Sequence, residues 1–163
     1  MNCKENMNMN MNMNMNKEEK PMGNTETHRK YYDNGNLKAE IQVINNEPDG
    51  ICRTYHETGE LAYEVPYVDG IKQGISKLYY ENGQLKYETP YVDGKEHGIC
   101  RTYYENGQLM WECPYVRGKR HGISKYYTDT GELIKEIEYI NGKEHDIIKD
   151  YYTSLVEKNI LCQ

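Results

Sequence analysis

The sequence repeats with a period of 24 residues, and this period constrains the fold more than any other feature. The most regular copy runs over residues 74–97; a close copy follows it at 98–121 and another precedes it at 50–73. The copies share columns of glycine, tyrosine, leucine and glutamate, for example Gly83, Tyr79, Leu85 and Glu88 in the copy at 74–97. A fixed period of this length predicts a repeat array in which each copy packs on its neighbours.

Each copy contains two runs of strand-like composition that are separated by a turn dipeptide, which is Asn82-Gly83 in the copy at 74–97. Asn-Gly between alternating residues is a strong signal for a β-hairpin. A second turn dipeptide, such as Asp69-Gly70, joins one copy to the next. We therefore expect an all-β fold: an elongated, single-layer antiparallel β-meander of tandem 24-residue hairpins. Prolines within the runs, such as Pro90, predict a bulge or a local break in pairing.

Opposite charges predict the register within each hairpin. A two-residue loop at Asn82-Gly83 places Lys77 opposite Glu88, and the same rule gives an opposite-charge pair in all five hairpins. A one-residue bulge would destroy this match, so we expect the two-residue loop. The turn at Asp69-Gly70 would then place Leu61 opposite Leu78. The face without the charged pairs is the more apolar one; we expect it to be concave and rich in tyrosine, with Gly74, Gly98 and Gly122 leaving room for tyrosine rings.

Composition and the chain ends divide the sequence into three parts. Residues 1–27 include a strict Met-Asn alternation, which predicts a disordered low-complexity tail; a metal-binding or self-associating methionine tract is the alternative. Residues 28–152 form about five repeats, and residues 153–163 form a C-terminal cap with a short helix that starts near Ser154. The 17 tyrosines and the absence of phenylalanine suit a half-exposed sheet. Five cysteines without a disulfide-framework spacing predict a cytoplasmic protein.

The repeated pattern Gly-x4-Tyr-Tyr-x-Asn-Gly-x-Leu-x-x-Glu-x-x-Tyr-x-x-Gly-x3-Gly resembles the MORN repeat variant found in many bacterial proteins, over roughly residues 28–152. The first copy departs from the pattern at Asn46 and the last at Asp146. The resemblance implies an elongated β-hairpin scaffold that binds proteins or, in some eukaryotic cases, lipids. Bacterial chains built mostly of this variant are similar to antitoxin or immunity partners of secreted toxins.

No catalytic, cofactor-binding or metal-binding constellation is evident in the sequence. His97, His121 and His145 recur with the period, but equivalent residues of neighbouring hairpins lie about 9–10 Å apart, too far to share a metal ion. Cys100 and Cys113 fall directly opposite one another in the predicted register. They are either small buried residues that stay reduced or a redox-responsive pair.

These observations predict a non-enzymatic scaffold that binds another protein across its tyrosine-rich face, with an antitoxin or immunity protein as one specific form. Aromatic side chains carry much of the binding energy at protein interfaces, and Trp111 is the only tryptophan. The candidate partner-binding residues are Tyr63, Tyr67, Tyr87, Tyr91, Trp111 and Tyr115. A structural or self-associating spacer is the alternative. The net charge of −6 disfavours nucleic acid and makes binding to anionic lipid the least favoured of the binding functions.

Overall fold

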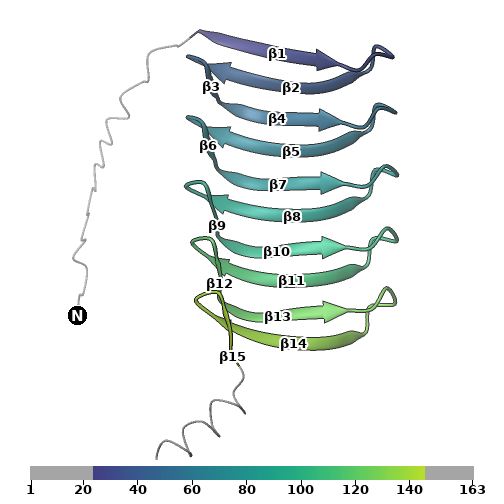
Figure 1. Ribbon diagram of the computed structural model, residues 1–163, viewed down its shortest axis with the longest axis vertical. Helices are drawn as coiled ribbons and strands as arrows, with labels where there is room; N and C mark the ends of the chain where they lie inside the picture. Colours follow the sequence, from purple (N-terminus) through teal and green to yellow (C-terminus); the bar gives the residue numbers. More distant parts are fainter. Residues whose placement is uncertain (1–23, 146–163) are drawn as a thin grey trace, which may run out of the picture.

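The computed structural model describes residues 24–145, which form one open, single-layer sheet with its hairpins stacked in sequence order (Figure 1). Every strand pair is antiparallel. The predicted all-β meander of tandem hairpins is therefore confirmed. The predicted C-terminal helix and most of the predicted tail lie outside the described residues.

Each repeat supplies two long strands and one short strand. The long strands are β1 (Thr25–Tyr31), β2 (Leu37–Ile44), β4 (Gly50–Tyr55), β5 (Leu61–Val68), β7 (Gly74–Tyr79), β8 (Leu85–Val92), β10 (Gly98–Tyr103), β11 (Leu109–Val116), β13 (Gly122–Tyr127) and β14 (Leu133–Ile140). The short strands are β3 (Glu47–Pro48), β6 (Ile71–Lys72), β9 (Lys95–Glu96), β12 (Lys119–Arg120) and β15 (Lys143–His145). The array begins at Thr25 rather than at the predicted His28, because Thr25 and Thr27 already pair with β2.

The predicted two-residue loop within each hairpin is wrong, although the pairing that it was meant to produce is present. Tyr80 N–H donates to Gln84 C=O at 2.8 Å and Gly83 N–H donates to Tyr80 C=O at 2.9 Å, which closes a loop of three residues. Gly83 has a φ of +81°, the left-handed conformation that such loops require at this position. The longer loop shifts the register by one residue, and a bulge beside Leu78 and Tyr79 shifts it back. Two irregularities thus cancel, and Lys77 still faces Glu88.

Two-residue turns occur instead at the opposite end of the hairpins. Asp69 and Gly70 both have positive φ, +50° and +75°, as a type I′ turn requires. After this turn, β6 pairs with the end of β5, and the chain then advances before β7 pairs with β5. Leu78 therefore faces Tyr63 rather than the predicted Leu61. The shift is two residues, so the division of side chains between the two faces is kept.

Glycine and proline cause the break in pairing between neighbouring hairpins. A Cβ atom on Gly98 would lie 2.9 Å from Cγ of Pro90, and one on Gly122 would lie 2.9 Å from Cγ of Pro114. These glycines make room for a proline ring and not for the predicted tyrosine ring. Between β8 and β10 only two residue pairs remain in register, and beyond them Pro90 C=O accepts a hydrogen bond from His97 N–H at 2.9 Å. The local break predicted near the prolines is therefore present.

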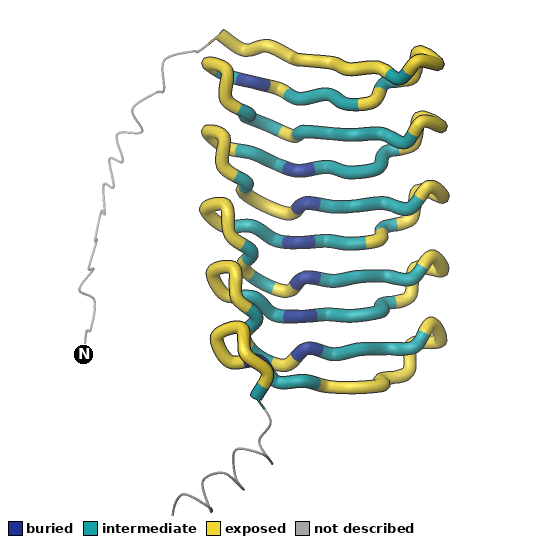
Figure 2. The backbone as a smooth tube through the Cα atoms, in the orientation of Figure 1, coloured by how far each residue is buried: buried dark blue, intermediate teal, exposed yellow. Residues whose placement is uncertain are grey.

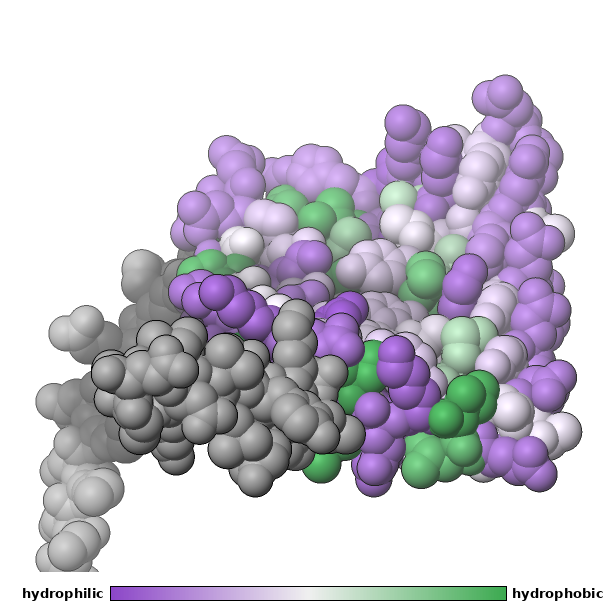
Figure 3. Space-filling view, turned by 60° about the horizontal axis from the view of Figure 1, so that its bottom comes forward, coloured by the Kyte–Doolittle hydropathy of each residue, from purple (hydrophilic) through white to green (hydrophobic). Residues whose placement is uncertain are grey.

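A single row of small side chains forms most of the core, and Val43 and Tyr139 are buried outside this row. Its buried members occupy equivalent positions near the middle of the strands and appear as one dark column in Figure 2: Val65, Ser76, Thr89, Cys100, Cys113 and Ser124. A single-layer sheet has no second layer to cover its side chains. Residues on it can be buried only by neighbouring side chains and by curvature of the sheet. Figure 3 shows the corresponding hollow, in which paler and apolar residues lie between hydrophilic rims. We call the face that carries this row the inner face and the opposite one the ladder face.

Candidate functional site

The ladder face carries one continuous row of alternating charges across the sheet. Each member is a Cα partner of the next, first within a hairpin and then between hairpins. In order, the charge ladder is Arg29, Glu40, Arg53, Glu64, Lys77, Glu88, Arg101, Glu112, Lys125 and Glu136. Opposite charges on directly facing strands stabilise a sheet by about 0.2–1 kcal/mol each. The ladder therefore sets the register along the whole array.

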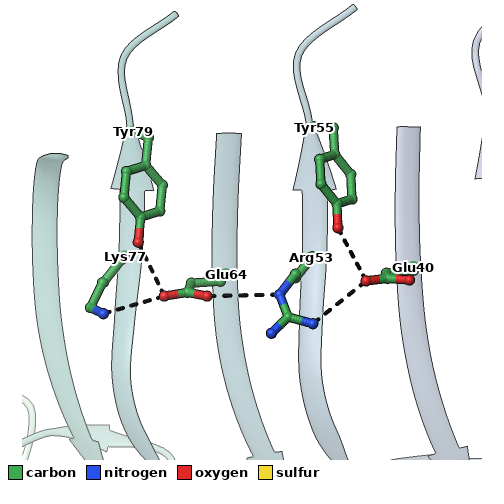
Figure 4. Close-up of polar contacts among 6 residues, drawn as sticks. All are labelled: Glu40, Arg53, Tyr55, Glu64, Lys77 and Tyr79. Atoms are coloured by element: carbon green, nitrogen blue, oxygen red, sulfur yellow. Dashed lines mark hydrogen bonds and ion pairs between the residues drawn. The ribbon is translucent and has the colours of Figure 1, made fainter. Parts of the chain in front are cut away.

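Ion pairs join most adjacent members of the charge ladder, and tyrosine hydroxyls complete it (Figure 4). Arg53 contacts Glu40 at 3.5 Å and Glu64 at 3.8 Å, and Lys77 contacts Glu64 at 3.3 Å. Tyr79 donates a hydrogen bond to Glu64 at 3.1 Å. The same bond links Tyr55 to Glu40 and Tyr103 to Glu88. Because each ladder carboxylate has at least one cation as a partner, and Glu40, Glu64, Glu88 and Glu112 also accept a tyrosine hydroxyl, we interpret the ladder as a structural feature and not as a free acid–base group.

The second tyrosine of three Tyr-Tyr pairs connects a hairpin to the following one. Tyr32, Tyr80 and Tyr104 donate to the backbone carbonyls of Tyr55, Tyr103 and Tyr127 at 2.7, 2.8 and 2.9 Å. Phenylalanine could make neither this bond nor the bond to the ladder carboxylates. The hydroxyl bonds between hairpins give a physical reason for the abundance of tyrosine and the absence of phenylalanine.

Exposed aliphatic residues gather beside the charge ladder. Ile75, Ile99 and Ile123 are 51%, 42% and 50% exposed, and within their hairpins Ile75 and Ile99 face the prolines Pro90 and Pro114. A shallow hollow of about 290 Å³ lies between Ile75 and Ile99, with Glu88 and Arg101 in its lining. This apolar band was not among the candidate binding residues.

All six candidate partner-binding residues lie on the inner face, and each is half-buried. They form two rows on either side of the buried small residues. Tyr63, Tyr87 and Trp111 belong to a row that runs through Leu78 and Thr102. Tyr67, Tyr91 and Tyr115 belong to the other row, where each faces the opening glycine of its own hairpin. The surface available to a partner is thus a band of aromatic edges.

Arg120 lies among several aromatic side chains of the inner face and contacts them. Its guanidinium lies 5.5 Å from the ring centre of Trp111 and 5.2 Å from that of Tyr139. Its Nε donates to the Tyr115 hydroxyl at 3.2 Å, and its Nη1 donates to the Tyr139 hydroxyl at 3.3 Å. Stacking and hydrogen bonds fix the arginine between aromatic rings, an arrangement typical of energetically important interface residues. We call these residues, together with Tyr126, whose ring centre lies 6.2 Å from that of Trp111, the Arg120 cluster.

Sequence reasoning found Trp111 and Tyr115 but missed Arg120, Tyr126 and Tyr139. The signal was present in the repeat column that reads Lys72, Glu96, Arg120 and Glu144, in which only one member is an arginine. Lys72 has a simpler version of the arrangement, with its Nζ 5.0 Å from the ring centre of Tyr91. The last repeats therefore have the densest set of aromatic and cationic contacts on the inner face.

Cys100 and Cys113 are Cα partners at the centre of the buried row, and both are free thiols. Burial raises the pKa of Cys100 to about 11, and it also raises the pKa of Cys113. The Cys113 sulfur accepts a hydrogen bond from the Ser124 hydroxyl at 2.8 Å. Burial opposes formation of the reactive thiolate at both residues, whereas the hydrogen bond from Ser124 favours it at Cys113 and only partly offsets the effect of burial. Redox responsiveness of the pair remains a prediction.

Within residues 24–145, no three His, Cys, Asp or Glu side chains come close enough together to hold a metal ion. His97 and His121 lie beside the two-residue turns and are exposed. In the same part of the chain no helix is long and apolar enough to cross a membrane.

Comparison with known proteins identifies the repeat. The family model described as MORN repeat variant matches residues 27–45, 48–69, 72–93, 96–117 and 120–141. No protein with curated annotation matches the sequence.

Among solved structures, TarM is 19% identical over 60% of this chain, with a TM-score of 0.39. A TarM point mutant from S. aureus in complex with Fondaparinux, alpha-GlcNAc-glycerol and UDP is 18% identical over 60% of this chain, with a TM-score of 0.40. The Streptococcus pneumoniae structure of accessory secretory protein 1, 2 and 3 is 9% identical over 61%, with a TM-score of 0.38. The matches span 19%, 19% and 18% of those longer chains.

Proposed function

Because the chain belongs to the MORN repeat variant family, we propose that it is a non-enzymatic scaffold that binds another protein through its inner face. The Arg120 cluster is the observation that carries this proposal. An arginine held against Trp111 and Tyr139 presents a planar, charged group at low entropic cost, since its side chain is already ordered in the free protein. The half-buried tyrosines on either side extend the contact surface along the array.

The charge distribution of the chain favours a protein partner over lipid or nucleic acid. Anionic lipids and nucleic acids need a basic surface, whereas the net charge here is −6 and most cations of the ladder face are paired with carboxylates. An acidic scaffold suits a basic partner, because opposite net charges accelerate association. We propose that the protein acts in the cytoplasm as an antitoxin or immunity partner, which neutralises a basic toxin by covering it.

Affinity purification of the tagged full-length chain, with substitutions on each face, tests the proposal. Trp111→Ala removes the ring on which Arg120 stacks, and Arg120→Gln removes the charge while keeping a polar side chain. Ile75→Ala on the ladder face is the matched control, since Ile75 is 51% exposed and lies on the opposite side of the sheet. We expect one stoichiometric protein with the wild type and with Ile75→Ala, and its loss with both inner-face variants.

Two outcomes would contradict the proposal at different levels. A partner that is retained by both inner-face variants and lost with Ile75→Ala would assign binding to the ladder face. Recovery of no protein at all would contradict the scaffold function itself. If a partner is recovered, its expression alone and together with the scaffold tests the antitoxin role, which predicts growth arrest in the first case and growth in the second.

A further inference from the structure

The outer edge of β1 is an open end of the sheet. No described strand pairs with this edge, and all seven residues of β1 are exposed. Asn45 N–H donates to Asn24 C=O, which fixes the alternation of hydrogen bonds: Glu26, His28 and Lys30 direct their backbone groups toward β2. The intervening Thr27 and Arg29 therefore direct theirs outward. An edge of this kind is a template for a further antiparallel strand.

The side chains of β1 are complementary to a second copy of the same strand. When two β1 strands align antiparallel over their whole length, His28 lies on the two-fold axis opposite its own copy. In this register Glu26 faces Lys30 of the second copy, and Lys30 faces Glu26, on the inner side of the sheet. The outward-directed Thr27 and Arg29 also face one another, so the pairs that would exchange backbone hydrogen bonds are in phase.

Glu26 and Lys30 cannot satisfy one another within one strand, because residues four positions apart in a strand are about 13 Å apart. Within residues 24–145, the partners of Glu26 are local: Asn24 at 3.3 Å and His28 at 3.5 Å, both at the exposed surface. Lys30 has no ion-pair partner among the described residues. Charged residues usually protect an edge from association. Here their order makes the edge self-complementary instead.

The charge ladder is incomplete at the same open end of the sheet. Interior arginines have a carboxylate on each side, as Arg53 has Glu40 and Glu64. In the part of the chain that the structure describes, Arg29 has one carboxylate partner, Glu40 at 3.5 Å, and its side chain is 51% exposed. In the full-overlap register Arg29 faces Thr27 of the second copy, whose hydroxyl can accept a hydrogen bond, and two Arg29 side chains do not meet.

We propose that β1 is a homodimerisation edge, through which two copies pair antiparallel about His28 to form one continuous sheet of twice the length. The partner is a second copy of this chain, and the inner faces of both copies remain available. The dimer is therefore independent of the proposed partner-binding function, and Trp111→Ala leaves it intact.

Disulfide trapping at the two-fold axis tests this register. In the dimer, the two copies of His28 would form a non-hydrogen-bonded pair. The Cα atoms of such a pair lie about 4.5 Å apart, within the range of a disulfide. His28→Cys is made in the full-length chain, with Cys3, Cys52 and Cys162 replaced by serine. Serine is tolerated in the column of Cys52, since Ser76 and Ser124 occupy equivalent positions. Tyr31→Cys is the matched control, because it lies at the end of the same strand and far from its own copy.

With mild oxidation we expect a covalent dimer from His28→Cys and a monomer from Tyr31→Cys. Charge exchange provides the second test. Glu26→Lys and Lys30→Glu each place like charges opposite one another at two sites and should weaken dimerisation about tenfold in sedimentation equilibrium. The double variant restores the pairs and the wild-type dissociation constant. Equal cross-linking of the two cysteine variants, a monomeric wild type at high concentration, or identical association of all charge variants would each overturn the proposal. Circular dichroism establishes that every variant is folded.

Discussion

At the scale of single residues, the tyrosines of the ladder face link consecutive hairpins through one hydroxyl each. Tyr79 lies in β7, and its acceptor Glu64 lies in β5 of the preceding hairpin, 3.1 Å away. Burial, followed by the nearby Glu64 carboxylate, raises the pKa of Tyr79 from 10.0 to about 12. An ionised Tyr79 would place a second negative charge beside Glu64, so the folded protein resists this ionisation.

Tyr79→Phe should lower the free energy of unfolding by about 1 kcal/mol at neutral pH, because the hydrogen bond to a charged acceptor is lost. The folded pKa is raised, so the contribution of Tyr79 is complete below pH 10 and declines as the pH rises toward about 12. The difference between wild type and variant should therefore shrink above pH 10. Urea unfolding between pH 8 and pH 11 measures it.

Tyr31→Phe is the control for this experiment. Tyr31 occupies the same repeat position, but it lies in the first described strand and is 56% exposed. A cost at Tyr31 equal to that at Tyr79, or a pH-independent difference at Tyr79, would contradict the role assigned to the hydroxyl.

At the scale of strands and turns, glycine and proline of neighbouring hairpins form a matched pair. Gly98 has a φ of +116°, and a Cβ atom there would meet Pro90 at 2.9 Å. Gly59 has a φ of +104°, and a Cβ atom there would meet nothing within 4 Å. Alanine at either position strains the backbone, but alanine at Gly98 also collides with the proline ring.

We expect Gly59→Ala to destabilise the protein by about 1 kcal/mol and Gly98→Ala by about 1–3 kcal/mol more. Replacing Pro90 by alanine should remove most of the additional cost in the Gly98→Ala background. A double-mutant cycle from thermal or urea unfolding measures the coupling between the two positions. Equal costs at the two glycines, or the absence of coupling to Pro90, would contradict the role of the close contact.

The strand register shows what the sequence could and could not determine. Charge complementarity identified the facing pairs within each hairpin correctly, because a shift of one residue would break these pairs and also exchange the two faces. The loop was predicted wrongly, since Asn-Gly suits both a two-residue type I′ turn and a three-residue loop that ends in a left-handed glycine. Only the backbone shows that Gly83 alone has positive φ and that a bulge compensates for the extra residue.

The candidate site, like the register, was predicted from the sequence only in part. Alternation placed six aromatic residues on one face, because the period of a strand is two residues. The Arg120 cluster was missed because it depends on β12, a short strand that carries Arg120 to residues of two other strands, β11 and β14. The alternation of residues within the long strands does not predict contacts that depend on how the following turn folds over the sheet.

At the scale of the whole molecule, the fixed period makes the array modular. Each hairpin pairs only with its neighbours in sequence order, so stability is a sum of similar local terms. Equivalent residues make equivalent contacts one repeat apart: Tyr79 bonds to Glu64, and Tyr103 bonds to Glu88. The interfaces on the two sides of any internal repeat should therefore be interchangeable.

Deletion of residues 74–97 tests this expectation, because it joins Gln73 to Gly98 just as Gln73 is joined to Gly74 in the native chain. Arg101 then takes the place of Lys77 opposite Glu64, and Tyr103 takes the place of Tyr79. We expect a folded sheet with the same far-ultraviolet circular dichroism per residue and a cooperative thermal transition at a lower temperature. Deletion of residues 74–85 removes half a repeat, so β8 takes the place of β7 and every later strand is reversed relative to the strands before the deletion. This deletion should abolish folding. If the two deletions were equally disruptive, the specific sequence of each repeat, and not its period, would determine the fold.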